Sequence, residues 1–168
     1  MTYTPYLTTC DGADSTIVTD LHCSVHVDAL TTAPYSLAWG SPVFAIVSAQ
    51  NVKGTSEYST EGGAAVILTN PDAPLNLADN PAQTSGSVIA LVWNVGAQDG
   101  GSPVIDYTLS YDEGTATESF VVVASGILDK NYLVSSNLTP GVTYTFKVQS
   151  RNVFGLSEYS APVSVLAA

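Results

Sequence analysis

The sequence contains little charge, and most of that charge is negative. Charged residues make up 11% of the 168 residues, and four Lys and Arg stand against fifteen Asp and Glu, a net charge of −11. Four scattered cations cannot neutralise a phosphate backbone, so we expect no nucleic-acid partner. Anionic membrane surfaces are disfavoured for the same reason, whereas the negative charge favours solubility.

Long apolar runs and catalytic signatures are also absent. No run of 18 apolar residues occurs, so we expect no membrane span. No signal peptide is visible at Met1, so a secreted form would have lost its signal or would carry it outside this sequence. There is no Gly-x-Ser-x-Gly elbow and no glycine-rich loop before a helix, so we expect no enzyme activity and no cofactor.

Few side chains are candidates for metal binding. The two histidines, His22 and His26, flank Cys23 on a predicted strand, where a spacing of four places them on one face. A metal site would need a third ligand, either Asp28 or the Cys23 thiolate. The alternative is a pair of surface histidines on an exposed strand, and we favour it because Cys23 is better used in a disulfide.

Two acidic turns lack a metal-binding pattern. The loop Asp11-Gly12-Ala13-Asp14 lacks the Asp-x-Asp-x-Asp-Gly spacing of an EF-hand, which favours a solvated loop over a calcium site. The turn Asp112-Glu113-Gly114 is typical of a hairpin. We therefore expect no metal site in the chain.

The second half of the chain has the pattern of short strands. Valine, threonine, serine and tyrosine are abundant, which favours strands over helices. After the stiff Pro71-Asp72-Ala73-Pro74 linker, alternating apolar residues predict strands at 88–93, 105–111, 120–124, 132–136, 144–148 and 160–167. About seven short strands with frequent turns predict an all-β Greek-key sandwich.

These residues resemble a fibronectin type III domain over 71–168. The ordered motifs are Pro74, Ile89-x-Leu91-x-Trp93, Gly100-Gly101-Ser102-Pro103-Val104 with Tyr107, Leu138-x-Pro140-Gly141-x-x-Tyr144-x-Phe146-x-Val148, and Asn152-x-x-Gly155-x-Ser157. The resemblance implies a complete sandwich whose structural core includes Trp93, Tyr107, Leu138 and Tyr144. We expect Trp93 to fill the space between the sheets and the Tyr144 hydroxyl to bond a backbone group at the corner turn.

A repeat links the two halves of the chain. Residues 47–59, which we call the first copy, match residues 148–160, the second copy, without gaps at an offset of 101. Eight of the thirteen positions are identical. An offset of one domain length is typical of tandem sandwiches. We therefore predict that residues 1–70 form the C-terminal half of another type III domain, without its three opening strands. Strands are expected at 2–9 and 24–30, and the last two strands within 43–69.

Two features set residues 1–70 apart. The only cysteines, Cys10 and Cys23, bracket a polar Gly/Asp loop, and we expect them to form a disulfide, which indicates an oxidising compartment. An insertion at 31–40 contains Tyr35 and Trp39, either a binding cluster or a core plug. Together, the cysteine pair and the insertion resemble repeats of large surface proteins of single-celled eukaryotes.

One N-glycosylation sequon is present, Asn137-Leu138-Thr139. It falls at the start of a predicted corner turn, so Asn137 is our candidate for a glycan, with chance occurrence in a threonine-rich chain as the alternative. O-linked sugars are possible on the many Ser and Thr residues, but no local signal selects a position.

Two function classes fit these observations. One is a structural repeat unit of an extracellular fibre, coat or cell-surface protein, which assembles with other copies of itself or with neighbouring repeats into a filament. The other is an adhesin or receptor-type ectodomain that binds a protein or carbohydrate ligand. A fold alone does not separate them. We favour the first, because half a sandwich leaves an open core and an unpaired strand edge. Either upstream sequence of the same polypeptide or strands of a neighbouring subunit would cover them.

Overall fold

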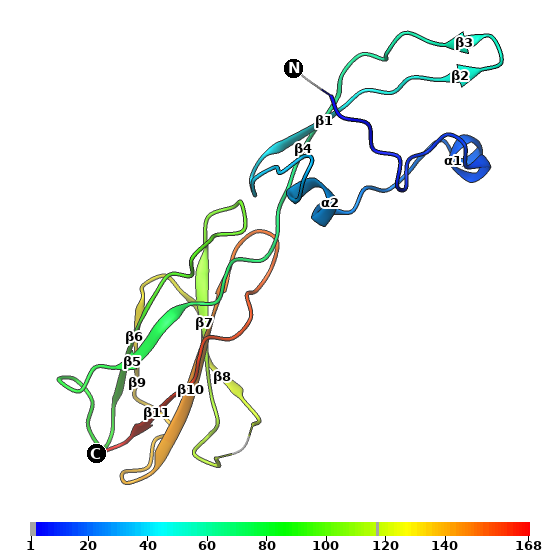
Figure 1. Ribbon diagram of the computed structural model, residues 1–168. Helices are drawn as coiled ribbons and strands as arrows, with labels where there is room; N and C mark the ends of the chain where they lie inside the picture. Colours follow the sequence, from blue (N-terminus) through cyan, green and yellow to red (C-terminus); the bar gives the residue numbers. More distant parts are fainter. Residues whose placement is uncertain (1–2, 117) are drawn as a thin grey trace. The chain divides into compact units, whose positions relative to one another are not determined.

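The computed structural model describes residues 3–116 and 118–168 (Figure 1). The chain divides into two compact units, Met1–Ile67 and Leu68–Ala168. Each unit has its own arrangement of strands and is described separately below.

The C-terminal unit is a sandwich of two antiparallel sheets. Its strands are β5 (Leu75–Asp79), β6 (Ile89–Asn94), β7 (Asp106–Tyr111), β8 (Val121–Ile127), β9 (Asn131–Val134), β10 (Thr143–Arg151) and β11 (Val163–Leu166). One sheet has the order β11-β10-β7-β8 and the other the order β5-β6-β9. The all-β sandwich predicted from the sequence is confirmed.

The core of this unit comes from the alternating residues of its central strands. Along β10, every second side chain is buried, as period-two alternation requires. Trp93 meets Tyr107 edge-on, with ring centroids 5.5 Å apart. Tyr144 is buried beside Tyr111, and Leu138 is half-buried against the same cluster.

The N-terminal unit has two short helices, α1 (Ser15–Asp20) and α2 (Val27–Thr31). Its strands are β1 (Pro42–Ala45), β2 (Gln50–Asn51), β3 (Gly54–Thr55) and β4 (Gly62–Val66). β1 pairs with β4, and β2 pairs with β3 at the tip of the same hairpin (Figure 1). Among the residues described in this unit, Ile67 alone is buried. The unit therefore has almost no core of its own.

Two predicted strands of this unit are wrong. Residues 3–9 contain no strand, and the predicted strand at 24–30 is largely replaced by α2. The alternation of Val25 and Val27 suggested a strand, but a strand needs a neighbour to satisfy its backbone and a helix satisfies its own. In α2, the hydroxyl groups of Thr31 and Thr32 also donate to the Asp28 carbonyl oxygen.

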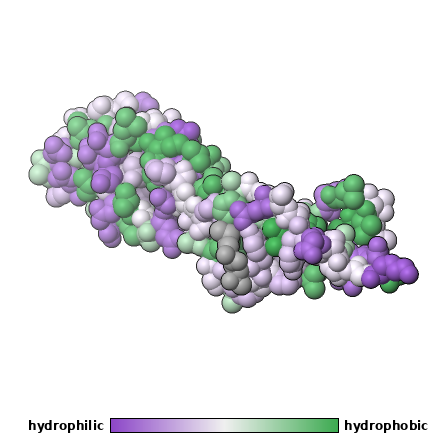
Figure 2. Space-filling model, turned by 90° about the horizontal axis from the view of Figure 1, so that it is seen from above, coloured by the Kyte–Doolittle hydropathy of each residue, from purple (hydrophilic) through white to green (hydrophobic). Residues whose placement is uncertain are grey.

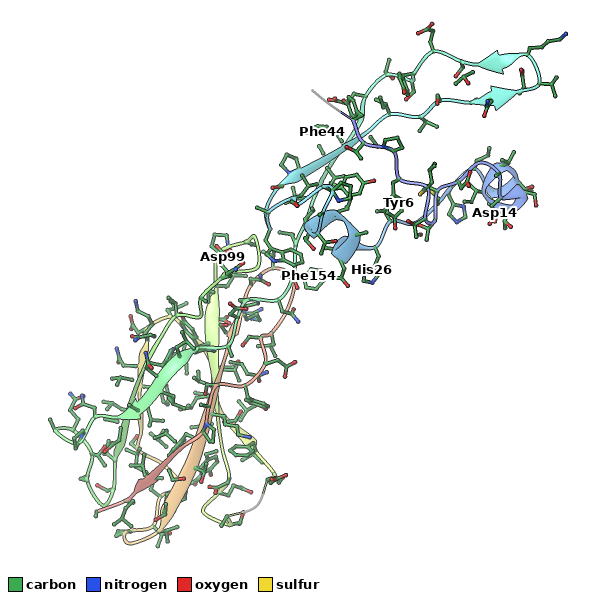
Figure 3. All side chains as sticks on the ribbon, in the orientation of Figure 1. Tyr6, Asp14, His26, Phe44, Asp99 and Phe154 are labelled. Carbon is green, nitrogen blue, oxygen red and sulfur yellow. A yellow bond between two sulfur atoms is a disulfide. The ribbon has the colours of Figure 1, made fainter. Side chains whose placement is uncertain are left out.

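The histidines consequently do not share the face of a strand. His22 follows α1, and His26 precedes the first residue of α2 and lies 3.2 Å from the Asp28 carboxylate. Figure 3 shows His26 at the start of α2 and Asp14 at the start of α1. A disulfide joins Cys10 to Cys23, with Cα atoms 5.2 Å apart, and encloses α1.

Candidate interaction surface

The repeated segments make the same hydrogen bonds in both units. In the first copy, Ser59 N–H donates to the Val47 carbonyl at 2.8 Å, and Val47 N–H donates to Ser59 Oγ at 3.0 Å. In the second copy, Ser160 and Val148 make the same two bonds at 2.9 and 3.1 Å. The sequence repeat is therefore also a repeat of backbone geometry.

A second serine bridge repeats three residues further in. Ser56 N–H donates to the Ala49 carbonyl at 2.8 Å, and Ala49 N–H donates to Ser56 Oγ at 3.0 Å. Ser157 and Ser150 form the matching pair at 2.8 and 3.0 Å. In each copy, the two serines thus hydrogen-bond the two arms of the hairpin to each other over a stretch where regular strand pairing is interrupted.

The turns and flanking strands follow the same correspondence. Asn51 Oδ1 accepts from Lys53 N–H at 2.8 Å, as Asn152 Oδ1 accepts from Phe154 N–H at 2.9 Å. Ala45 pairs with Gly62 as Phe146 pairs with Val163, again at the offset of 101. A bulge at Ala64 of β4 shifts the register between Val43 and Phe44. The hairpin from β1 to β4 therefore copies the hairpin from β10 to β11.

The two hairpins differ sharply in burial. Val148 and Ser150 are fully buried, whereas Val47 is 69% exposed and Ala49 is also exposed. The exposed large apolar side chains of the first hairpin are Phe44, Val47, Val52, Tyr58 and Val66. Figure 2 shows that apolar residues, in green, lie among polar ones on the face of the molecule in view.

The difference arises at one strand edge. In the C-terminal unit, β7 pairs with β10 from Phe146↔Tyr111 to Arg151↔Asp106 and covers the edge that faces away from β11. Among the described residues, no strand pairs with the equivalent edge, and no hydrogen bond involves the backbone groups of Ile46 or Ser48. We call residues 45–50 the open edge.

An ion pair fixes one end of the covered edge. Arg151 Nε donates to Asp106 Oδ1 at 2.9 Å, and the Arg151 guanidinium also bonds Oδ2. This hydrogen bonding lowers the pKa of the buried Asp106 carboxyl and raises the pKa of Arg151. On the open edge, Gln50 occupies the position equivalent to Arg151. Because Gln50 is uncharged, a strand paired there needs no carboxylate at the position of Asp106.

A second contrast lies at the turn of each copy. Asn152 Nδ2 donates to the carbonyl oxygens of Thr69 and Asp99, both at 2.8 Å, and so holds the start of its own domain (Figure 3 labels Asp99). A Cβ on Gly155 would lie 2.7 Å from Asn70 Oδ1, whereas a Cβ on the equivalent Gly54 would meet nothing within 4 Å. The first copy therefore has the turn that holds a domain's opening segment, but no such segment is seated there among the described residues.

The remaining candidates from the sequence are placed as follows. Asn137 is exposed in the loop between β9 and β10. Asp14 caps α1 by accepting from Thr16 N–H at 2.8 Å. Hydrogen bonding from the Thr16 side chain, and then from its backbone, lowers the Asp14 pKa. Tyr35 is half-buried and donates to the Pro5 carbonyl at 2.7 Å, and Trp39 is also half-buried. In the described part of the chain, no three His, Cys, Asp or Glu side chains gather as a metal-binding group.

Sequence reasoning missed two features of the C-terminal unit. Asp112 is buried rather than an ordinary turn residue, and its Oδ1 accepts from the N–H groups of Gly114 and Thr145, both at 3.0 Å. On the outer face, Lys147 Nζ lies 4.1 Å from the ring centre of Phe120 and 5.6 Å from that of Tyr159. The three residues are distant in sequence, so no local pattern could have grouped them.

Comparisons with known proteins agree with this geometry. Residues 72–166 match the family model of the fibronectin type III domain. The chain belongs to this family. Human myomesin-2 is 30% identical over 131 residues, and M-protein of striated muscle from Gallus gallus is 28% identical over 131. Human protein sidekick-1 is 30% identical over 100 residues.

These relatives are much longer than this chain. The matches cover 76% of this chain but 9% of myomesin-2 and of M-protein, and 60% of this chain but 4% of sidekick-1. The crystal structure of titin domains A168-A170 matches with a TM-score of 0.58 at 26% identity, over 78% of this chain and 42% of that chain. Matches of that coverage include residues of the N-terminal unit as well as the type III domain. Neither helix within the described ranges reaches the length and hydropathy needed to cross a membrane.

Proposed function

We propose that this chain is a non-catalytic structural repeat of an extracellular fibre, coat or cell-surface protein, and that it assembles with copies of itself or neighbouring repeats through strand contacts. The observation that carries the proposal is the open edge. It is one edge of a type III hairpin, with exposed apolar side chains and with backbone groups at Ile46 and Ser48 that make no hydrogen bond among the described residues.

Other features support this setting. A disulfide such as Cys10–Cys23 persists in oxidising compartments outside the cytosol. The exposed Asn137 sequon fits a glycoprotein. We also propose that residues 1–70 are similar to repeats of large surface proteins of single-celled eukaryotes, which is consistent with a structural repeat outside the cell.

One observation favours the alternative function, an adhesin or receptor-type ectodomain. The outer-face cluster of Phe120, Lys147 and Tyr159 presents aromatic rings and a cation, and aromatic side chains are enriched at the centres of binding interfaces. Tyr35 supports it less, because its hydroxyl already donates to the Pro5 carbonyl of its own unit.

Electron microscopy of the native material, in which neighbouring repeats are present, tests the proposal. Ordered filaments or arrays that lengthen with protein concentration are the expected result, because a head-to-tail strand contact does not close on itself. Isolated particles at all concentrations would favour the ectodomain function instead.

A further inference from the structure

We propose that the open edge is the acceptor site for an antiparallel β-strand, and that the strand it takes is the equivalent of β7 from the opening half of a fibronectin type III domain. This inference rests on the proposed assembly function and names its contact. The contact is one added strand in a fixed register.

The internal repeat supplies the register. β7 residues 106–111 pair with β10 residues 146–151, so that Gln149 lies opposite Thr108 and Lys147 opposite Ser110. Subtracting the offset places Ser48 opposite the Thr108 equivalent of the incoming strand. The backbone groups of Val47 and Ala49 bond Ser59 and Ser56, which lie on the side of the strand away from the open edge. Because backbone groups alternate in direction along a strand, those of Ile46 and Ser48 are directed at the incoming strand.

The side chains of the open edge describe the strand that it accepts. On one face, Ala45, Val47 and Ala49 replace Phe146, Val148 and Ser150, and the first copy has less side-chain volume there. Tyr107, Leu109 and Tyr111 cover the corresponding face of β10 from β7. The accepted strand therefore carries large aromatic or aliphatic side chains at alternate positions, as β7 does.

The empty turn identifies the rest of the partner. In the C-terminal unit, the segment that leads into β5 lies against Asn152 and Gly155, with β7 on the adjoining edge. The first copy repeats both sites, and both are unfilled in the described residues. A single occupant fills both, namely the opening segment and strands of a type III domain. A second copy of this chain does not fit, because its β7 is already paired on both sides, with β10 and β8. The occupant is therefore the opening half of a neighbouring repeat.

A register-specific cross-link tests the inference. The probe is a synthetic peptide of residues 102–112, which contains β7, with cysteine in place of Thr108. It is incubated with the full chain carrying Ser48→Cys in a thiol redox buffer. We expect mixed-disulfide formation to be about tenfold faster than with a peptide carrying the cysteine at Ser102, because strand pairing raises the effective concentration at one register only.

The matched control is Gln149→Cys, the equivalent position in the complete domain. Its edge is already covered by β7, so no register preference is expected there. On the unmodified chain, the wild-type peptide should slow amide exchange at Ile46 and Ser48, whereas a scrambled peptide should not. This second measurement does not depend on any cysteine variant.

Three results would overturn the inference. They are equal cross-linking of both peptides, unchanged exchange at Ile46 and Ser48, and preferential Ser48→Cys homodimers, which would make a second copy the occupant. If filaments form but the peptide fails, the assembly function stands and its contact lies elsewhere. If the peptide binds in register but no assemblies form, the acceptor site stands without the fibre.

Discussion

The hydroxyl oxygen of Tyr144 accepts a hydrogen bond from the backbone N–H of Thr139 at 2.7 Å. Tyr144 is 3% exposed on β10, and Thr139 lies in the turn just before that strand. The bond fixes the turn against the sandwich. It also satisfies the Thr139 N–H, which lies outside the strand pairing of β10. The sequence motif predicted a tie of the Tyr144 hydroxyl to a backbone group in this corner turn.

Replacing Tyr144 with Phe removes that bond and keeps the ring. We expect the Tyr144→Phe variant to lose about 1–2 kcal/mol of unfolding free energy, since a backbone N–H is left without its partner. Urea unfolding of the C-terminal unit measures the loss. Tyr159→Phe is the control, because the Tyr159 hydroxyl makes no hydrogen bond among the described residues and its ring stays in place. Equal stability of the two variants would contradict the role assigned to the Tyr144 hydroxyl.

Trp93 should matter for stability and not for assembly. It is 3% exposed and packs edge-on against Tyr107, so Trp93→Ala should cost about 3–5 kcal/mol from lost burial and the cavity left behind. The exposed Val153 of the same unit provides the control, and Val153→Ala should change little. Thermal unfolding of Trp93→Ala within a few degrees of the parent would show that the core assignment is wrong.

The Asp106–Arg151 pair makes stability depend on acid pH. Because the folded state lowers the Asp106 pKa, its contribution is present above the unfolded pKa of about 4 and is lost as the pH falls through the folded pKa. Asp106→Asn should therefore be less stable than the parent at pH 7, and the difference should shrink on acidification. Urea unfolding across this range measures it, with the exposed Asp129→Asn as control. A difference that stays constant with pH would contradict the prediction.

Asn137 should carry a glycan in protein from a eukaryotic secretory pathway. The residue is exposed in a loop, and its sequon is intact. Mass spectrometry of native material should find Asn137 modified and, after enzymatic removal of N-glycans, converted to Asp. Native material with only unmodified Asn137 would remove the claim.

The C-terminal sandwich was predictable because its signals are local. The alternation of Ile89, Leu91 and Trp93 and the turn residues around Gly141 mark strands and corners without reference to the rest of the chain. The N-terminal unit was less predictable, because a strand is stable only when a neighbouring strand accepts its backbone hydrogen bonds. Val25 and Val27 alternate like strand residues, but none of the described strands pairs with them, and a short helix forms at 27–31 instead.

The interaction surface shows the same division. The repeat at an offset of 101 was readable in the sequence, and it located the hairpin whose edge is open. The Asn152 bonds to Thr69 and Asp99 were not readable, because they join segments far apart in the chain. The bulge lies on β4, where Ala64 has no partner in the register between β1 and β4. Gly62-Gly63 was a local signal for it, since glycine within a strand often marks a bulge, and sequence reasoning missed it.

Amide hydrogen exchange at equivalent positions of the two copies tests the open edge most directly. In the dilute, isolated chain we predict fast exchange at Ile46 and Ser48 and slow exchange at Lys147 and Gln149, because β7 covers the second pair and no described strand covers the first. Similar protection at all four amides would contradict the open edge, and with it the strand-acceptor site and the assembly proposed from it.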